Sequence, residues 1–421
     1  MLPNWHKQNW SGHASYGAVR FHRPKTVAAV QDIVRRADKV KVIGSRHCFN
    51  DIADTSGDLL WLGDLDSTAV IDPERRIATV NAGITYEALC PQLERAGFAL
   101  ANLPSLKHVT VIGAAMTATH GSGDALANLA MAISKLEMVT ANGDCVELAR
   151  ECDGDTFRGA VVSVGALGVV TRVVLDLEPS FFVQQDNYEK LPFREMFAHF
   201  DEITAGGYSV SLFPSWQHDW VENVWVKRRV PSLTPVDVPR QFFGAALASA
   251  KPSGEPALDR TRTPCGLPGV WHERLPHYAF HDAWAVGNEL QSEYFIPRKH
   301  AVAAIAAVLA LREGLAPVLG RSEIRTVRAD DLWLSSAYGQ DTVAIHFNWL
   351  KDGEGVARVL PVLEAALLPF GARPHLGKLF AMSAAQLAAV HPRWTDFRQL
   401  VRQFDPAGKF NNRFLEKYLP Q

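Results

Sequence analysis

The stretch Ile43-Gly44-Ser45-Arg46-His47-Cys48-Phe49-Asn50 follows directly on an apolar, strand-like segment at 39–43, with no helix-starting pattern between the strand and the histidine. A glycine here lets backbone N–H groups turn toward an anion, and Ser45 and Arg46 add hydroxyl and guanidinium donors. The stretch therefore predicts a phosphate-binding loop that ends in the imidazole of His47. Taken alone, it fits a tight turn with a surface histidine equally well, because short motifs often match by chance.

Two later segments are rich in small and hydroxylated residues, which allow a backbone to lie against a flat ligand. The first is Leu-Pro-Ser-Leu-Lys-His-Val-Thr-Val-Ile-Gly at 103–113, which continues as Thr-Ala-Thr-His-Gly-Ser-Gly at 117–123. The second is Gly-Ala-Leu-Gly-Val-Val-Thr at 165–171, before a strand that we predict to run to residue 177.

In this order and spacing, the three segments resemble the vanillyl-alcohol-oxidase type of flavoprotein, and within it the alditol (xylitol) oxidases. The resemblance continues through Ser-Glu-Ile-Arg at 322–325, Ala-Ile-His-Phe at 344–347, Pro-His-Leu-Gly-Lys-Leu-Phe at 374–380 and Phe-Asp-Pro-Ala-Gly-Lys-Phe-Asn at 404–411. It implies an FAD cofactor bonded through its 8α methyl group to His47. It also implies the remaining cofactor-binding residues: Val42, Ile43, Gly44, Ser45, Arg46, Cys48, Ser105, Thr110, Gly113, Thr117, Ala118, Thr119, His120, Gly168, Val169 and His375.

Composition agrees with a soluble enzyme. The chain has 421 residues, of which 47% are hydrophobic and 21% charged, and its net charge of −2 gives no electrostatic reason to expect nucleic acid or an anionic membrane as partner. Five cysteines at no ligand-like spacing argue against a disulfide scaffold or a metal site. The first residues show no secretion pattern, so we expect a cytoplasmic protein, and we expect it to be a monomer.

Local patterns predict an α+β fold of two domains. Helices are expected at 25–37 and at 85–96 with Thr85 as N-cap, and hairpins at 69–80 and 136–148, the latter turning at Asn142-Gly143. A Rossmann domain is disfavoured, because no strand opens into Gly-x-Gly-x-x-Gly, and no Walker A lysine is present. We assign an FAD-binding domain to 1–180, a substrate (cap) domain to 181–375, and a segment returning to the FAD domain to 376–421.

The cap domain is expected to be a mixed sheet covered by helices. We predict strands at 208–213, 223–229, 324–328 and 342–350, and helices at 299–312 and 355–368, with a further helix at 394–403 beyond the cap. The proline- and glycine-rich stretch 252–269 is interpreted as a surface loop or lid.

Two of these strands carry polar side chains on one face. Alternation puts Glu323 and Arg325 opposite Ile324, and puts His346 and Asn348 opposite Ile345 and Phe347. A charged face is usually solvated, but two such stripes resemble the floor of a pocket. Lys378 stands in an apolar stretch, where a snorkelling lysine is the structural alternative.

In alditol oxidases the matching positions lie against the flavin ring, and the resemblance implies these roles. Glu323, Arg325, Ser105 and Asn348 bind the polyol, and Arg325 also stabilises the developing alkoxide. Lys378, or alternatively His346, takes the hydroxyl proton. Hydride then passes from the terminal primary alcohol to the flavin, which gives the aldose, and O2 reoxidises the flavin with formation of H2O2.

Three positions depart from the family pattern: Cys48 stands for a serine, Asn348 for a threonine, and Pro104 occupies the position thought to control oxygen access. Two alternatives stay open, a sugar-1,4-lactone oxidase or dehydrogenase of the same family and a flavin- or sugar-binding protein without turnover. The remaining polar residues are interpreted as structural, including four histidines taken as surface or satisfied core residues: His218, His272, His277 and His281.

Overall fold

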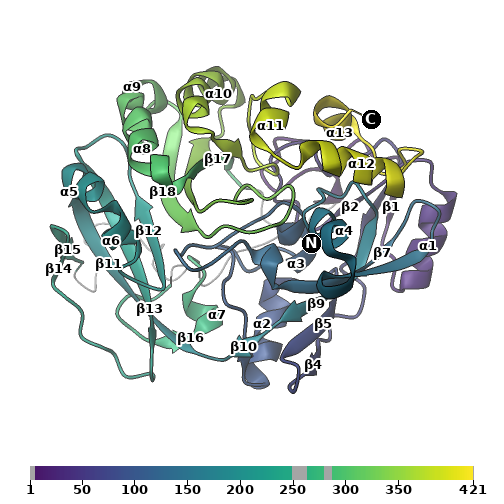
Figure 1. Cartoon of the computed structure of the whole chain (residues 1–421), viewed down its shortest axis with the longest axis horizontal. Helices are drawn as coiled ribbons and strands as arrows, with labels where there is room; N and C mark the ends of the chain where they lie inside the picture. Colours follow the sequence, from purple (N-terminus) through teal and green to yellow (C-terminus); the bar gives the residue numbers. More distant parts are fainter. Residues whose placement is uncertain (1–4, 249–262, 279–286, 421) are drawn as a thin grey trace.

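The computed structural model describes residues 5–248, 263–278 and 287–420. The chain forms two adjoining bodies, with the first part of the sequence in one and a large sheet in the other (Figure 1). Most of the stretch 252–269 lies outside the described residues, as does His281.

The first part of the chain contains two sheets. Three parallel strands are ordered β1 (Arg20–His22), β3 (Asp58–Trp61) and β2 (Val40–Ile43). Five antiparallel strands are ordered β4 (Val70–Asp72), β5 (Ile77–Asn81), β9 (Val169–Asp176), β7 (Ile133–Val139) and β8 (Cys145–Ala149). The predicted mixture of pairings in this part is confirmed, as are both hairpins.

Four helices accompany these sheets, and two of them were predicted. They are α1 (Val27–Arg36), α2 (Tyr86–Arg95), α3 (Val111–Met116) and α4 (Arg150–Val161). Thr85 caps α2 as expected, since its side chain accepts a hydrogen bond from the N–H of Ala88. A short pair, β6 (Phe98–Ala99) with β10 (Glu178–Pro179), leads toward the second body.

The second body is built on a sheet of ten described strands. Its order is β14 (Gln241–Phe242), β15 (Ala245–Leu247), β11 (Phe182–Pro192), β13 (Trp220–Val230), β12 (Ser209–Phe213), β18 (Leu319–Val327), β19 (Thr342–Leu350), β17 (Glu289–Pro297) and β20 (Arg373–Pro374), with β16 (Gly269–Val270) paired to β11. Every described pair in it is antiparallel, so our expectation of mixed pairing in the cap was wrong. The domain boundaries after residues 180 and 375 stay a prediction.

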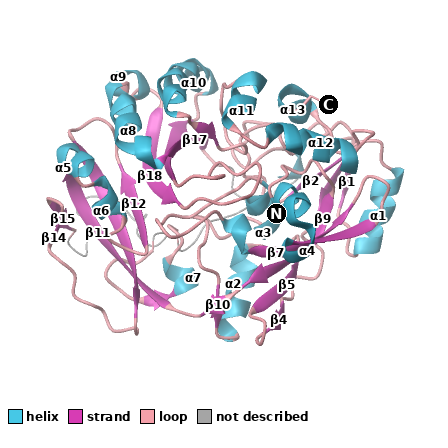
Figure 2. Cartoon of the chain, in the orientation of Figure 1, coloured by secondary structure: helices cyan, strands magenta, loops and turns pink. Residues whose placement is uncertain are grey.

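Helices cover one face of this sheet (Figure 2). They are α5 (Phe193–Ala198), α6 (Phe200–Thr204), α8 (Ala301–Ala310), α9 (Arg312–Leu315) and α10 (Gly353–Leu367), while α7 (Trp271–Arg274) lies apart. Ala301, Ala304, Ile305 and Val308 of α8 are buried at helical spacing. Because strand side chains alternate, burial of Ile324, Ile345 and Phe347 leaves their polar neighbours on the opposite face.

The C-terminal helices lie over the first body (Figure 1). They are α11 (Ala384–Val390), α12 (Trp394–Phe404) and α13 (Arg413–Tyr418). Polar contacts tie this segment to the region around β2. The N–H of Val40 donates to the carbonyl of Lys409, and Nδ2 of Asn412 donates to the carbonyls of residues 51, 52 and 54. The C-terminal segment therefore holds the chain on both sides of the loop after β2.

Candidate active site

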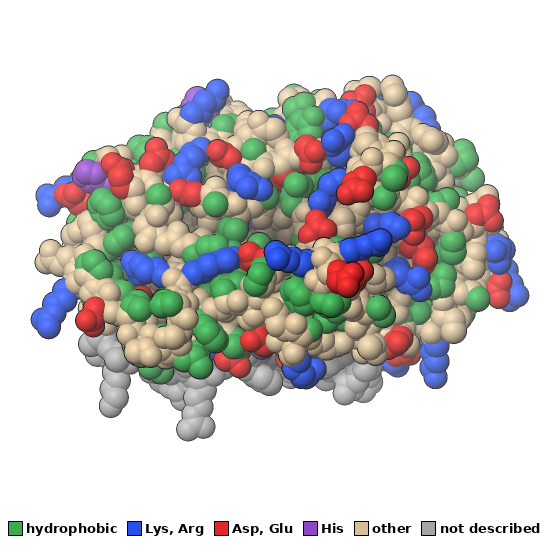
Figure 3. Space-filling model, turned by 60° about the horizontal axis from the view of Figure 1, so that its bottom comes forward, with side chains coloured by type: hydrophobic (Ala, Val, Ile, Leu, Met, Phe, Trp, Pro, Cys, Tyr) green, Lys and Arg blue, Asp and Glu red, His purple; other side chains and the backbone are tan. Residues whose placement is uncertain are grey.

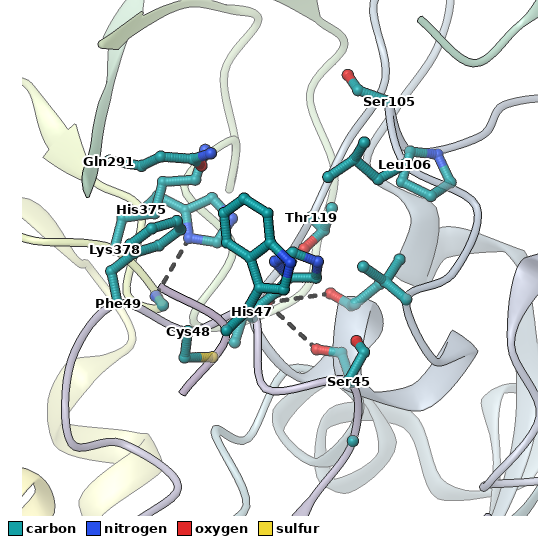
Figure 4. Close-up of a pocket in the computed structure, with 18 of the residues that line it drawn as sticks. Ser45, His47, Cys48, Phe49, Ser105, Leu106, Thr119, Gln291, His375 and Lys378 are labelled. Carbon is teal, nitrogen blue, oxygen red and sulfur yellow. Dashed lines mark hydrogen bonds between the residues drawn. The ribbon is translucent and has the colours of Figure 1, made fainter. Parts of the chain in front are cut away.

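A cavity of about 990 Å³ lies between the loop after β2 and the polar face of the cap sheet. This volume is at the upper end for ligand pockets, as a dinucleotide cofactor and a substrate together require. Figure 4 shows Ser105 and Leu106 on one side, Gln291, His375 and Lys378 on the other, and His47 between them. All the predicted site residues line this cavity except Ala118 and Val169. These two are direct sequence neighbours of residues that do line it.

Glycines allow the walls of the cavity to approach each other. A Cβ on Gly44 would lie 2.3 Å from Oγ1 of Thr110, and a Cβ on Gly113 would lie 2.5 Å from the same atom. Oγ1 of Thr110 is buried and has no hydrogen-bond partner among the described residues. Buried polar atoms are nearly always paired, so this end of the cavity fits a ligand with polar groups that lies close to the backbone.

His47 and Arg46 point in different directions. The ring of His47 packs against the rings of Trp10 and His108, at centroid distances of 4.6 and 4.4 Å. Arg46 has a φ of 64°, and its NH1 atom donates to the backbone carbonyls of Trp5 and Gln8. We expected the guanidinium group of Arg46 to face an anion. Its NH1 atom instead binds the N-terminal segment.

Lys41 is a cavity residue that the sequence reasoning missed. It is buried on β2, and its Nζ donates to the carbonyl of Gly165 over 3.1 Å. Burial lowers the pKa of Lys41 to about 7. The signal was present in the sequence, because a lysine inside an apolar strand needs a partner.

Glu293 organises the polar face of the cap sheet, and the sequence reasoning missed it as well. The residue is 1% exposed, and four partners surround its carboxylate. Its Oε1 lies 2.6 Å from NH2 of Arg325 and 3.1 Å from Nε2 of His120. Its Oε2 lies 2.7 Å from Nζ of Lys378 and 3.6 Å from Nδ1 of His346.

Strand register explains this convergence. Glu293 pairs with His346, and His346 pairs with Glu323, so the three side chains form one row across β17, β19 and β18. Lys378 reaches the row from a turn after β20, in which its N–H donates to the carbonyl of His375. The two pocket strands that we predicted are thus joined by a third, β17.

The cluster shifts the pKa values of two nitrogen bases, His346 and Lys378. Burial, reinforced by the charge of Lys378, lowers the pKa of His346 to about 3, so its ring is neutral at neutral pH. Nδ1 of His346 lies 2.7 Å from Nζ of Lys378 and accepts its hydrogen bond, which leaves the ring proton on Nε2. Burial, helped by Arg325, lowers the pKa of Lys378, while Glu293 raises it.

Further polar contacts border the cluster. NH1 of Arg325 donates to Oγ of Ser105 over 3.4 Å, which connects the two sides of the cavity. Nδ2 of Asn348 donates to Oε1 of Glu289 over 2.8 Å, so the predicted substrate ligand has a protein partner in this structure. His277 also lines the cavity. It is buried, and neither of its ring nitrogens makes a hydrogen bond within the described part of the chain, so it is neither the surface residue nor the satisfied core histidine that we expected.

Residues 5–248, 263–278 and 287–420 contain neither a metal-binding cluster nor a membrane-spanning helix. No group of three or more histidine, cysteine or acidic side chains there has the geometry to hold a metal ion. No helix there combines the length and apolarity needed to cross a bilayer.

Comparison with known proteins agrees with this architecture. A model of FAD binding domains matches residues 19–149, and a model of D-arabinono-1,4-lactone oxidases matches residues 287–418. The chain is 44% identical to an alditol oxidase of Streptomyces sp. over 98% of both proteins. It is 29% identical to an L-gulono-1,4-lactone dehydrogenase of Mycobacterium tuberculosis over the full length of both, and 26% identical to the mouse L-gulonolactone oxidase over 97% of both.

Among solved structures, cholesterol oxidase from B. sterolicum superposes with a TM-score of 0.78 at 16% identity, covering 98% of this chain and 96% of that one. The resemblance inferred from the sequence is therefore confirmed, together with the fold class and FAD as the cofactor. By its identity to a full-length relative, the chain belongs to the alditol oxidases within the vanillyl-alcohol-oxidase type of FAD-linked oxidases.

Proposed function

We propose that this protein oxidises the terminal primary alcohol of an alditol, such as xylitol or sorbitol, to the aldose, with O2 reduced to H2O2. The observation that carries the proposal is the buried cluster of Arg325, His346 and Lys378 around Glu293, which faces the same cavity as the loop of His47. Simple retention of a ligand does not require several ionisable groups at this place. The 44% identity to an alditol oxidase supports the same substrate class.

FAD would be held by the loop 42–48, by Thr110, Gly113 and residues 117–120, by 168–169 and by His375. When bound, the flavin supplies the hydride acceptor and the route of electrons to oxygen. We propose that it is bonded covalently to His47, whose ring borders the cavity between Trp10 and His108. Lys41 is added to the predicted set, because a pyrophosphate at this end of the cavity would hold its buried Nζ in the ammonium form and accept a hydrogen bond from it.

The substrate would be oriented by Glu323, Arg325 and Ser105. Arg325 has three nitrogen atoms in three directions: NH2 on Glu293, NH1 on Ser105, and Nε 3.6 Å from Glu323. A guanidinium keeps its proton at any working pH, so Arg325 stabilises the developing alkoxide and is no base. Asn348, held by Glu289, would contact a more distant hydroxyl.

Lys378 would take the hydroxyl proton. Two of its N–H bonds are directed to Oε2 of Glu293 and to Nδ1 of His346. The remaining position on Nζ is a third N–H in the ammonium form and a lone pair in the amine form. The amine therefore accepts a proton while both of its protein hydrogen bonds persist. His346 is less suited to this role, because Lys378 already uses its Nδ1 atom.

We also propose that the protein works as a cytoplasmic monomer, with a polyol and O2 as its partners and without nucleic acid or membrane. Acidic and basic side chains are interspersed over the face in Figure 3, in keeping with a net charge of −2. All five cysteines are free.

The test is the visible spectrum of the purified protein, mixed anaerobically with xylitol and then opened to air. Bleaching of the flavin followed by recovery and peroxide formation supports an alditol oxidase. Bleaching without recovery in air indicates a dehydrogenase that uses another electron acceptor.

A lactone oxidase or dehydrogenase is the second candidate, because residues 287–418 match the D-arabinono-1,4-lactone oxidase model. Bleaching by a sugar-1,4-lactone and not by xylitol favours this reading. Bleaching by neither substrate favours a binding protein without turnover.

A further inference from the structure

His277 is held in place by its backbone. Its N–H donates to the carbonyl of Ser105, and its carbonyl accepts from the N–H of Thr263, both over 3.2 Å. The preceding carbonyls of Leu275 and Pro276 both accept from Nζ of Lys227, a buried lysine on β13. Bonds to three separate segments therefore fix the position from which the side chain enters the cavity.

Packing fixes the ring of His277 as well. It stands edge-on to the rings of Trp225 and Phe213, at centroid distances of 5.2 and 5.8 Å. Only 8% of the side chain is exposed. A ring enclosed in this way has one orientation to offer to a ligand.

The polar atoms around the ring lack partners. Nε2 of His277 lies 3.1 Å from Oε1 of Glu323, and Nε of Arg325 lies 3.6 Å from that same oxygen. Within the described residues, none of these three buried atoms makes a hydrogen bond, nor does Nδ1 of His277. Since more than nine in ten buried polar groups are paired in folded proteins, these neighbouring atoms without hydrogen bonds mark a place that a polar ligand completes.

The charges that face the ring determine its form. Lys227, Arg325, Arg321 and His346 surround His277, and Glu323 is the acidic side chain beside it. Burial, reinforced by the basic side chains of Lys227, Arg325 and Arg321, holds the pKa of His277 well below its usual value. The neutral ring has one hydrogen-bond donor and one acceptor. A hydroxyl group can also donate and accept, so the two are complementary.

We infer that His277 is a specificity-determining residue that binds a hydroxyl of the polyol next to the one that reacts. This inference rests on the proposed function and deepens it. Arg325 spans the two places, because its NH2 contacts Glu293 at the Lys378 end of the cluster, while its Nε lies near the Glu323 oxygen that His277 approaches at the other end. The reacting hydroxyl of the polyol would lie at the Lys378 end. A neighbouring hydroxyl of the same polyol molecule would lie at the His277 end.

The test compares xylitol with pentitols that each lack one hydroxyl, in the wild type and in His277→Phe and His277→Gln. Phenylalanine keeps an aromatic ring but removes both nitrogen atoms, whereas glutamine keeps a donor and an acceptor. For His277→Phe we expect kcat/KM for xylitol to fall roughly 10-fold, with no change for the one analogue that lacks the bound hydroxyl. His277→Gln should recover part of the loss.

His272→Gln is the matched control, because His272 lies in the same segment but does not line the cavity. An equal loss for all analogues in His277→Phe, or no loss for any, overturns the inference. Binding is also followed anaerobically, by titrating each polyol into the flavin spectrum. If the wild type binds xylitol without oxidising it, the proposed function fails while the binding constants still decide the role of His277; if it does not bind xylitol, both proposals fall.

Discussion

Oε2 of Glu293 lies 2.7 Å from Nζ of Lys378, and the same carboxylate holds Arg325 on its other oxygen at 2.6 Å. One buried anion thus separates two cations and fixes both at the edge of the cavity. An isolated buried charge is costly, so each member of this group depends on the others. The group therefore acts as a unit, and the first prediction concerns its centre.

Glu293→Gln should shift the pH profile of turnover to lower pH. The carboxylate raises the pKa of Lys378, so its neutralisation lowers that pKa further. If Lys378 accepts the proton as an amine, the limb on which kcat/KM rises with pH moves to lower pH. If instead the limb on which kcat/KM falls with rising pH moves to lower pH, the ammonium form is needed and Lys378 is not the base. Glu364→Gln is the control, since Glu364 is also buried but bonds to Tyr294 under α10.

Lys378→Met should abolish most turnover and leave the flavin in place. Methionine has a similar length and no proton acceptor, and general-base catalysis is worth about 10² to 10⁴ in rate. The rate is measured by anaerobic flavin bleaching with xylitol, and the flavin content by absorbance. An unchanged rate at full flavin content would remove Lys378 from the mechanism.

His47→Ala should release the flavin when the protein is denatured. The proposed linkage makes the flavin of the wild type precipitate with the polypeptide in acid, whereas the variant should leave it in the supernatant. His218→Ala, which changes an exposed histidine, should behave as the wild type does. Flavin that stays with the His47→Ala chain would contradict the proposed linkage and point to another attachment residue, such as the neighbouring Cys48.

Gly44→Ala should destabilise the protein and weaken flavin binding, and removal of the Thr110 hydroxyl should restore part of the lost stability. The new Cβ would lie 2.3 Å from Oγ1 of Thr110 but 3.4 Å from its Cβ, so the Thr110→Ala background relieves most of the clash. We expect the single variant to lose about 1–3 kcal/mol of stability by overpacking. Flavin content and thermal unfolding report the result. Gly314→Ala is the control, because its Cβ would meet no atom within 4 Å. Equal losses in the single and double variants would contradict the steric account.

Local patterns predicted those elements that depend on neighbours in the chain. The strand expected at 342–350 has the same bounds as β19, and the Asn142-Gly143 turn joins β7 to β8. Periodicity and turn chemistry act over a few residues, so one sequence suffices to read them. The alternation on β18 and β19 also indicated the polar face of the sheet, because it needs only the two-residue period of a strand.

Glu293 and His277 could not be found in the same way. The role of Glu293 depends on the register of β17 against β19, and pairing register between distant strands leaves no mark in a single sequence. Only the presence of a glutamate among Ser292, Tyr294 and Phe295 hinted at a partner. His277 lies outside any helix or strand, and its place in the cavity follows from hydrogen bonds to Ser105 and Thr263. The pairing mode of the cap sheet was likewise misjudged, since it is a property of the assembled strands.

The tie between the C-terminal segment and the chain around the loop after β2 also bears on the order in which the protein folds. Nζ of Lys39 donates to the carbonyl of Gly408, which is 369 residues away in the sequence, and Asn412 holds the carbonyls of residues 51–54. Contacts between such distant residues form late, because the intervening chain must first become compact. We therefore expect residues 44–50, which lie between these contacts, to be among the last parts of the fold to settle.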